Sequence, residues 1–423
     1  MTGEKEKMHS LAVAKDPHTL SMKQLIRMLH ARAVRSYKQP IINIREQRTI
    51  GYEGLSRGIH PDTGEIVVPD VLFHSAKANG LTPEIDRMCS DMAIAAFAKY
   101  ARKGELLFVN FDASSLEEVN AGISWILNKT IALGLRPESI AIEIVESRVT
   151  NDASLMRFVE WHREFGFKIV LDDFGAQHSN LDRLHMLKPD IVKIDQNLVH
   201  GMATDHYKRA IVESIVILSE KVGALSLVEG AESIEDILEC VAMGVNLLQG
   251  FYFSEPIRAE AVIGAQLDAR IAHVFNAAVE QLQQKWRDKQ EEARHYEEIV
   301  AYFARLLGAG NVRSLDEALE RIVMDAVGVE CAYVVNSDGI QVTHTHFQSE
   351  EQAQQMAGIR GATPKGSNHF LKHYFLKMKN SNKQRAMTRP YVSLATGNVC
   401  RTMGQVLQGH DGQVYYLFVD FVL

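Results

Sequence analysis

The sequence lacks any apolar run long enough to span a membrane, because no stretch of about 18 uncharged apolar residues occurs among its 423 residues. Residues 1–10 are charged and have no apolar core of the kind that an export signal carries. We therefore expect a cytoplasmic protein without membrane insertion.

Cysteine is scarce in this sequence. The four cysteines lie far apart at Cys89, Cys240, Cys331 and Cys400. This spacing indicates reduced core thiols rather than disulfides or zinc ligands, and we assign them no functional role.

The net charge is −7, and acidic and basic residues are interspersed along the chain. This pattern gives no positively charged face of the kind that binds a long nucleic acid. A small nucleotide needs only one or two local cations and is still allowed.

The length and the hydrophobic content of 46% are sufficient for two domains with proper cores. Beyond about residue 258 the chain becomes rich in Ala, Gln, Glu, Lys and Arg, which predicts a long connecting helix. We expect an N-terminal extension over 1–20, a large domain over 21–258, a helical linker over 259–307 and a smaller α+β domain over 308–423.

Polar residues follow a series of short apolar runs in the first sixty percent of the chain, and we expect the first strand at 40–44. Helix-like stretches lie between these runs, at 84–101, 116–133, 152–165, 206–222 and 234–243. The resulting units have the length of a βα repeat, which predicts a TIM-like (β/α)8 barrel over about 35–258. Side chains at the carboxyl ends of such strands meet at one mouth. The polar residues are Glu53, Asn110, Glu143, Asp172, Asp173, Lys193, Glu229 and Gln249.

Five carboxylates at one mouth would repel one another unless cations neutralised them. Mg²⁺ and Mn²⁺ prefer oxygen ligands, and Asn110 adds a neutral one. Neighbouring side chains on a strand point to opposite faces, so Asp172 and Asp173 can serve one site only where the chain leaves the strand. Bridging and terminal carboxylates suit two ions about 3.5–4 Å apart, the arrangement used for phosphoester hydrolysis. Lys193 would orient or deprotonate water or stabilise phosphate charge, and Arg57 would bind a phosphate oxygen.

The segment Glu53-Gly54-Leu55-Ser56-Arg57 resembles the signature of the EAL-domain family, bacterial phosphodiesterases that open cyclic di-GMP to the linear dinucleotide. The similarity continues in order through the barrel to Gln249-Gly250-Phe251-Tyr252-Phe253.

The resemblance implies a role for each matching residue. It makes Lys193 the water-handling lysine, Arg57 the phosphate-binding residue and Gln249 the residue that closes the nucleotide site, with Leu55 and Asp195 also at the substrate. It makes Glu53 and Glu229 catalytic as well as metal-binding. It places Glu146 as the anchor of the loop after the aspartates and matches Glu232 to another acidic position. The implied metal ligands are Glu53, Asn110, Glu143, Asp172, Asp173 and Glu229.

Two positions depart from the family pattern. Gly54 stands where the family usually has alanine, which should leave Glu53 in place but loosen the backbone. The loop after the aspartates reads Gly175-Ala176-Gln177-His178, whereas active members usually carry Thr-Gly-Tyr after the glycine. In the family this loop orders the second metal and the dimer contact, so its divergence concerns the catalytic rate more than binding.

The C-terminal segment predicts an amphipathic helix from Leu315 followed mainly by strands. We expect one hairpin of 331–336 with 340–344 and another of 406–407 with 414–422. The segments 333–339 and 389–393, with Asp411-Gly412 before a final apolar strand, resemble PAS or Cache-type sensor domains, which would receive an unknown small-molecule or protein signal. A dimerisation or packing module without a ligand is the alternative. The long helix could pack on the barrel, pair with its copy in a homodimer, or do both.

The sequence therefore predicts a cyclic di-GMP phosphodiesterase that uses two Mg²⁺ or Mn²⁺ ions to form linear pGpG and is regulated by its C-terminal domain. The alternative is a catalytically silent or very slow cyclic di-GMP receptor. A cyclase motif with paired glycines before Asp-Glu-Phe is absent, so synthesis of cyclic di-GMP is not expected.

Overall fold

The computed structural model describes residues 19–111, 124–145, 152–176, 181–308, 315–349, 363–380, 384–409 and 411–423. Glu146 and the loop residues 177–180 lie outside these ranges. The chain divides into two compact units, with the division after Leu282. This point falls inside helix α11 (Ala265–Gly308), which confirms the predicted linking helix.

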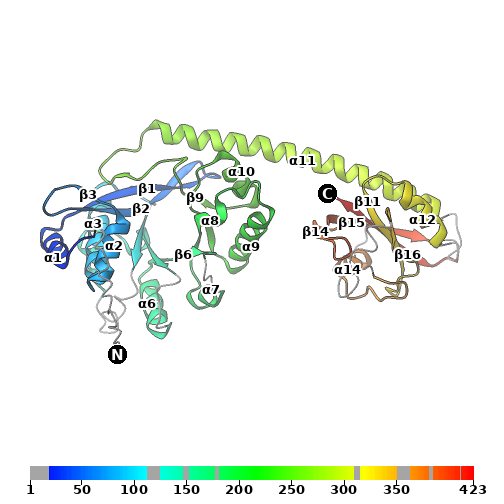
Figure 1. The fold of residues 1–423 in the computed structure, drawn as a ribbon, viewed down its shortest axis with the longest axis horizontal. Coiled ribbons are helices and arrows are strands. Elements are labelled where there is room, and N and C mark those ends of the chain that lie inside the picture. Colours follow the sequence, from blue (N-terminus) through cyan, green and yellow to red (C-terminus); the bar gives the residue numbers. More distant parts are fainter. Residues whose placement is uncertain are drawn as a thin grey trace, which may run out of the picture. The chain divides into compact units, whose positions relative to one another are not determined.

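The first unit is a closed barrel of eight strands, as predicted (Figure 1). Strand β1 pairs antiparallel with both β2 and β9, whereas the remaining neighbours pair in parallel. Two short strands pair antiparallel with the barrel strands: β3 (Ile66–Val67) pairs with β2, and β10 (Ile257–Arg258) pairs with β1. The barrel strands are β1 (Val34–Asn43), β2 (Arg48–Ile59), β4 (Leu106–Phe111), β5 (Ile140–Val145), β6 (Lys168–Phe174), β7 (Ile191–Ile194), β8 (Leu225–Val228) and β9 (Leu247–Leu248).

Helices cover the outside of the barrel and pack on the outward side chains of its strands. The expected helices 206–222 and 234–243 coincide with α9 and α10, since each has a capping side chain at its start (Asp205 or Ser233) and a left-handed glycine at its end. The helices are α1 (Met22–Ala31), α2 (Pro69–Ala78), α3 (Thr82–Tyr100), α5 (Trp125–Ala132), α6 (Asp152–Glu164), α7 (Leu181–Leu187), α8 (Gln196–Val199), α9 (His206–Val222) and α10 (Ile234–Met243), with a 3-10 turn η2 (Pro137–Ser139).

The second unit is an antiparallel sheet with a core on each face. Side chains of α11 and α12 (Leu315–Asp325) fill one core, and those of α14 (His373–Asn380) fill the other. The strand order is β12-β11-β16-β15-β13, with β14 paired to β15. The strands are β11 (Val329–Asn336), β12 (His346–Phe347), β13 (Arg385–Met387), β14 (Tyr391–Val392), β15 (Val399–Gln408) and β16 (Val414–Val422).

Both expected hairpins form, one of them irregularly. Strands β15 and β16 pair from Gln408↔Val414 to Cys400↔Val422. The chain that returns after β11 makes the antiparallel bridge Val335↔Gln341, and backbone hydrogen bonds join 336 to 340 and 342 to 334. Side chains add to this pairing, since Asn336 Oδ1 accepts from the Ile340 amide and Thr343 Oγ1 accepts from the Val334 amide. The returning chain then continues into β12, which pairs with β11, and β16 also pairs with β11.

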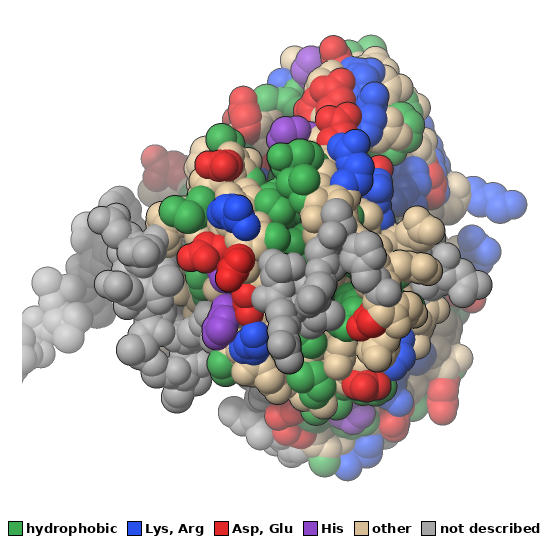
Figure 2. Space-filling model, turned by 90° about the vertical axis from the view of Figure 1, so that its right-hand side faces the viewer, with side chains coloured by type: hydrophobic (Ala, Val, Ile, Leu, Met, Phe, Trp, Pro, Cys, Tyr) green, Lys and Arg blue, Asp and Glu red, His purple; other side chains and the backbone are tan. Residues whose placement is uncertain are grey.

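None of the helices in the described part of the chain has the length and hydropathy needed to cross a membrane. On the face drawn in Figure 2, lysine and arginine side chains lie among acidic, histidine and apolar side chains. The charge on this face is therefore mixed, as the composition indicates.

Candidate functional site

The barrel interior contains an apolar layer and, two residues further along the strands, a polar layer. Phe108, Ala141, Val170, Ile191, Leu227 and Leu247 belong to the buried apolar layer. Since side chains on one face of a strand recur every second residue, the residue two positions beyond each of these also faces the barrel interior. Those residues are Asn110, Glu143, Asp172, Lys193, Glu229 and Gln249.

Lys193 lies at the centre of this polar layer and is almost completely buried. Its Nζ lies 2.5 Å from Glu229 Oε1, 2.7 Å from Glu143 Oε1 and 3.1 Å from Asp172 Oδ1. A fourth carboxylate oxygen, Glu53 Oε1, is 3.9 Å away. Charged groups from five different strands or strand ends therefore meet at one point. The sequence predicted this convergence from the order of the polar residues along the chain.

Asp172 and Asp173 reach the site in a way that the sequence did not indicate. We expected the chain to leave the strand at this pair, but β6 continues to Phe174. The pairing of β6 with β7 shifts by one residue between Leu171↔Val192 and Phe174↔Ile194, and Asp173 has a left-handed φ of 56°. This bulge brings oxygens of both aspartates and of Glu229 within 4.8 Å of one another.

A network of amide side chains holds Glu53. Gln249 donates from Nε2 to Glu53 Oε2 (2.5 Å) and to Gln39 Oε1 (2.9 Å), while Asn110 Nδ2 lies 3.3 Å from Glu53 Oε1. Gln39 in turn donates to the carbonyl of Ser254 at 3.0 Å. Sequence reasoning missed Gln39 because it placed the first strand at 40–44, whereas β1 begins at Val34 and pairs Gln39 with Glu53.

The charges and orphaned polar atoms at this site fit divalent cations. Burial raises the pKa of Glu143 well above its usual value and that of Glu229 to about 8, although Lys193 acts in the opposite direction. Burial alone would lower the pKa of Lys193, but the surrounding carboxylates raise it overall. Within the described residues, Glu143 Oε2 and Gln249 Oε1 have no hydrogen-bond donor. One lysine thus faces an excess of buried carboxylates, which oxygen-preferring cations would neutralise.

The expected substrate-binding residues occupy more varied positions. Leu55 and Arg57 follow Glu53 at two-residue steps on β2, and the Arg57 guanidinium lies 5.3 Å from the centre of the Tyr37 ring. Asp195 is buried and caps α8, since its Oδ1 accepts from the Asn197 amide. Glu232 is half-exposed, with Oε2 3.9 Å from His200 Nε2. Glu146, for which we predict an anchoring role, lies outside the described residues.

The sequence profile described as the EAL domain matches residues 22–256, which is more than half of the chain. The chain belongs to the EAL-domain family. YkuI of Bacillus subtilis, an uncharacterized EAL-domain protein, is 26% identical over 392 residues, which cover 91% of this chain and 93% of YkuI. The crystal structure of YkuI with cyclic di-GMP and calcium has a TM-score of 0.77 at 24% identity and covers 94% of this chain and 99% of its own, which shows that both units share its fold.

Other EAL-domain relatives match the barrel alone. RocR of Pseudomonas aeruginosa, a cyclic di-GMP phosphodiesterase, is 26% identical over 239 residues, which are 56% of this chain and 61% of RocR. The structure of the MucR phosphodiesterase in complex with cyclic di-GMP has a TM-score of 0.51 at 28% identity and covers 56% of this chain and 97% of its own. The family match therefore concerns the barrel.

Two glycines show how closely the backbone packs around the EAL-domain site. A Cβ on Gly250 would lie 2.2 Å from the carbonyl oxygen of Ala231, so only glycine lets the segment after Gln249 approach the segment that follows β8. A Cβ on Gly54, which replaces the alanine of the EAL signature, would lie 2.9 Å from the Cβ of Ala93 on α3. Ala93 thus occupies the space of the missing methyl group, and the change leaves no gap beside Glu53.

Proposed function

We propose that this chain hydrolyses cyclic di-GMP to linear pGpG as a metal-dependent phosphodiesterase. The observation that carries the proposal is the convergence of Glu53, Glu143, Asp172 and Glu229 on Lys193 at the mouth of an EAL barrel. RocR, the phosphodiesterase named above, and the MucR complex with cyclic di-GMP support the choice of reaction and substrate.

Two Mg²⁺ or Mn²⁺ ions would be held by six residues of this site. The amide of Asn110 supplies a neutral oxygen once it turns, because its nitrogen and oxygen occupy equivalent positions. When bound, the ions would acidify a water molecule and neutralise charge on the phosphate. The six residues are Glu53, Asn110, Glu143, Asp172, Asp173 and Glu229.

The chain's own side chains bind and orient the substrate. Arg57 contacts a phosphate oxygen while the Tyr37 ring supports its guanidinium, and Leu55 provides an apolar contact between Glu53 and Arg57. Lys193 holds the attacking water and offsets negative charge that develops on the phosphate. Water adds to phosphorus, one P–O3′ bond breaks, and a proton goes to the leaving 3′ oxygen, which yields the linear dinucleotide.

Further roles follow from the family resemblance. Gln249 closes the nucleotide site, Asp195 lies beside the substrate, and Glu146 and Glu232 anchor the loop after the aspartates. We also propose that the chain forms a homodimer and that the C-terminal unit regulates the barrel. Light scattering of the purified chain tests the dimer, and a mass of one chain at micromolar concentration would refute it.

The test is incubation of the purified full chain with cyclic di-GMP and Mn²⁺ or Mg²⁺, with product separated by chromatography and binding measured on the same sample. We expect linear pGpG that disappears on chelation and in Glu53→Ala. Glu46→Ala is the matched control, since Glu46 is exposed and pairs with Arg48. Absence of product in the wild type, or unchanged activity in Glu53→Ala, would overturn the proposal.

The catalytically silent receptor is the second candidate, because Ala176-Gln177 replaces the usual Thr-Gly of active members. Tight binding without product in the same experiment would establish it. Replacement of Ala176 and Gln177 with Thr-Gly should raise the rate of a slow enzyme, and an unchanged rate would remove the loop as the explanation.

A further inference from the structure

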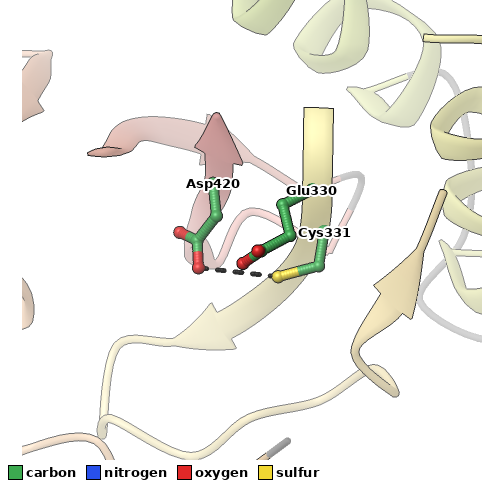
Figure 3. Close-up of side chains that lie close together, drawn as sticks. All are labelled: Glu330, Cys331 and Asp420. Atoms are coloured by element: carbon green, nitrogen blue, oxygen red, sulfur yellow. Dashed lines mark hydrogen bonds between the residues drawn. The ribbon is translucent and has the colours of Figure 1, made fainter. Parts of the chain in front are cut away.

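A second cluster of side chains of the types that can bind a metal lies in the C-terminal unit, on the face of the sheet that α14 covers. Glu330 and Cys331 come from β11 and Asp420 from β16, and each is at least nine-tenths buried. Figure 3 shows the three side chains pointing toward one another, with the Cys331 thiol 3.5 Å from Asp420 Oδ2. One ligand atom from each residue lies within 4.8 Å of the other two.

A β-bulge builds this cluster. The register of β11 with β16 shifts between Val329↔Phe421 and Cys331↔Asp420, so Glu330 is an extra residue in β11. Val329 and Ala332 both belong to the core under α11 and α12, although three positions separate them. Glu330 and Cys331 therefore both turn to the opposite face, where Tyr333 continues the pattern. Regular alternation would have placed one of them in the apolar core.

The hydrogen bonds of the two carboxylates come from neutral groups and leave one oxygen of each without a donor. Thr396 and Asn398 donate to Glu330 Oε1, and Tyr391 donates to Asp420 Oδ2. Among the residues that the structure describes, Glu330 Oε2 and Asp420 Oδ1 are buried without a hydrogen-bond partner. Within the described ranges, neither carboxylate forms an ion pair with a lysine, arginine or histidine.

Two acids and a thiol that are buried without a counter-charge form an unfavourable arrangement. A bound cation would remove this penalty by pairing with both carboxylates and with a thiolate.

Cys400 on β15 adds a second sulfur. It is fully buried, and Glu330 is one of the charged groups near its thiol. Thr402 pairs with Asp420, and since Cys400 is two residues from Thr402 on the same strand, both side chains lie on the face of the cluster. Three strands thus supply two sulfur and two oxygen donors.

We propose that Glu330, Cys331, Cys400 and Asp420 form a binding site for a thiophilic divalent cation of the zinc class. Mixed sulfur and carboxylate donors select zinc over magnesium or calcium, which take oxygen ligands. With bonds of about 2.3 Å to sulfur and 2.0 Å to oxygen, a sulfur and an oxygen on one tetrahedral zinc ion lie about 3.5 Å apart, the separation of Cys331 Sγ and Asp420 Oδ2. The neutral donors around the carboxylates act as the outer groups that orient metal ligands.

The bound ion links β11, β15 and β16 from one face of the sheet. Its binding stabilises the folded C-terminal unit by mass action and makes the stability of this unit depend on zinc. This inference concerns residues outside the barrel and does not depend on the phosphodiesterase proposal.

The test uses Co²⁺ as a spectroscopic substitute for zinc in the purified, chelator-treated full chain. Thiolate ligation gives a sulfur-to-cobalt charge-transfer band, whereas the oxygen and amide donors of the barrel site give none. We expect the band to saturate at one ion per chain and to disappear when Zn²⁺ displaces Co²⁺. Mg²⁺ should leave the band unchanged.

The four cysteines provide a matched pair of double variants. Cys331→Ser/Cys400→Ser should abolish the band, and Cys89→Ser/Cys240→Ser, which alters the two buried cysteines of the barrel, should retain it. Absence of the band in the wild type, or its persistence in Cys331→Ser/Cys400→Ser, would overturn the proposal.

Isosteric variants of the two carboxylates provide a second test if the cysteine variants do not fold. Asp420→Asn and Glu330→Gln keep both thiols and the side-chain volumes, and each should weaken Zn²⁺ binding at least tenfold in competition with a chelator. Unchanged zinc affinity in both folded variants would show that the carboxylates are not ligands.

Discussion

The barrel and the C-terminal unit each bury a group of acidic side chains, but they balance the negative charge differently. In the barrel, Lys193 lies within 4 Å of four carboxylates. In the C-terminal unit, Glu330 and Asp420 have neutral hydrogen-bond donors and neighbouring thiols. The barrel site thus has part of its counter-charge within the chain, whereas the C-terminal cluster depends on an ion for all of it.

The difference also concerns the metal that each cluster suits. Oxygen donors on separate strands leave room for hard ions and for a substrate, as catalysis requires. Buried sulfur and oxygen donors on neighbouring strands of one sheet suit a structural ion with no open position. The following changes, from the largest expected effect to the smallest, test this contrast.

Lys193→Met would make the barrel resemble the C-terminal cluster by removing its internal cation. We expect the chelator-treated variant to lose about 3–5 kcal/mol of barrel stability, because several carboxylates remain buried without a partner. Mn²⁺ should recover more stability in the variant than in the wild type. Urea denaturation measures both values, and Lys168→Met, at a surface pair with Asp190, is the control. Equal losses in the two variants would contradict the central role of Lys193.

His162 shows that the barrel also buries a titratable group with neutral partners only. Its ring lies 2.9 Å from Ser124 Oγ and 2.8 Å from the Phe158 carbonyl, and burial lowers its pKa to about 4. Since the folded pKa lies below the unfolded value of about 6.5, this contribution to stability is complete above pH 6.5 and is lost as the pH falls toward 4.

Replacement of His162 by Gln should remove this pH dependence, which amounts to about 3 kcal/mol between pH 6.5 and 4. The measurement is the free energy of unfolding of wild type and variant across that range, with exposed His185→Gln as the control. Parallel curves for wild type and His162→Gln would show that His162 is not the titrating group.

Gly54→Ala tests how tightly the backbone packs beside the barrel site. Although alanine restores the family signature, its methyl group would lie 2.9 Å from Ala93 Cβ, so we expect a loss of about 1–3 kcal/mol. Ala93→Gly in the same chain should recover most of this loss. A double-mutant cycle from thermal denaturation measures the coupling energy between positions 54 and 93. Additive effects of the two substitutions would show that Ala93 does not occupy the space of the methyl group missing at Gly54.

Asp420→Asn reduces the charge of the C-terminal cluster. In chelator we expect the stability of this unit to rise by about 1 kcal/mol, because a buried negative charge without a cation is removed. In excess Zn²⁺ the variant should be less stable than the wild type, because it has lost a ligand. A change of the same sign under both conditions, measured by thermal denaturation, would contradict the proposed ion.

The barrel residues could be predicted because each is separated from its neighbours by an apolar strand and an amphipathic helix. The helices 206–222 and 234–243 were predicted to the residue, since their capping residues are local signals. Gln39 was missed because the polar residues 35–39 hide the start of β1. The hairpin at 340–344 was predicted, but its irregular pairing was not, because the hydroxyl of Thr343 and the side chain of Asn336 replace some of the ladder bonds.

The sequence by itself determined which residue types reach the barrel mouth, because strand periodicity and the βα alternation place them there whatever the details of packing. Tertiary structure alone decided how Asp172 and Asp173 share one site and how Glu330 joins Cys331. Both depend on a bulge, in which one residue has no partner on the neighbouring strand. The position of such a residue follows from the register between strands that are distant in sequence, and this register is established only when the sheet forms.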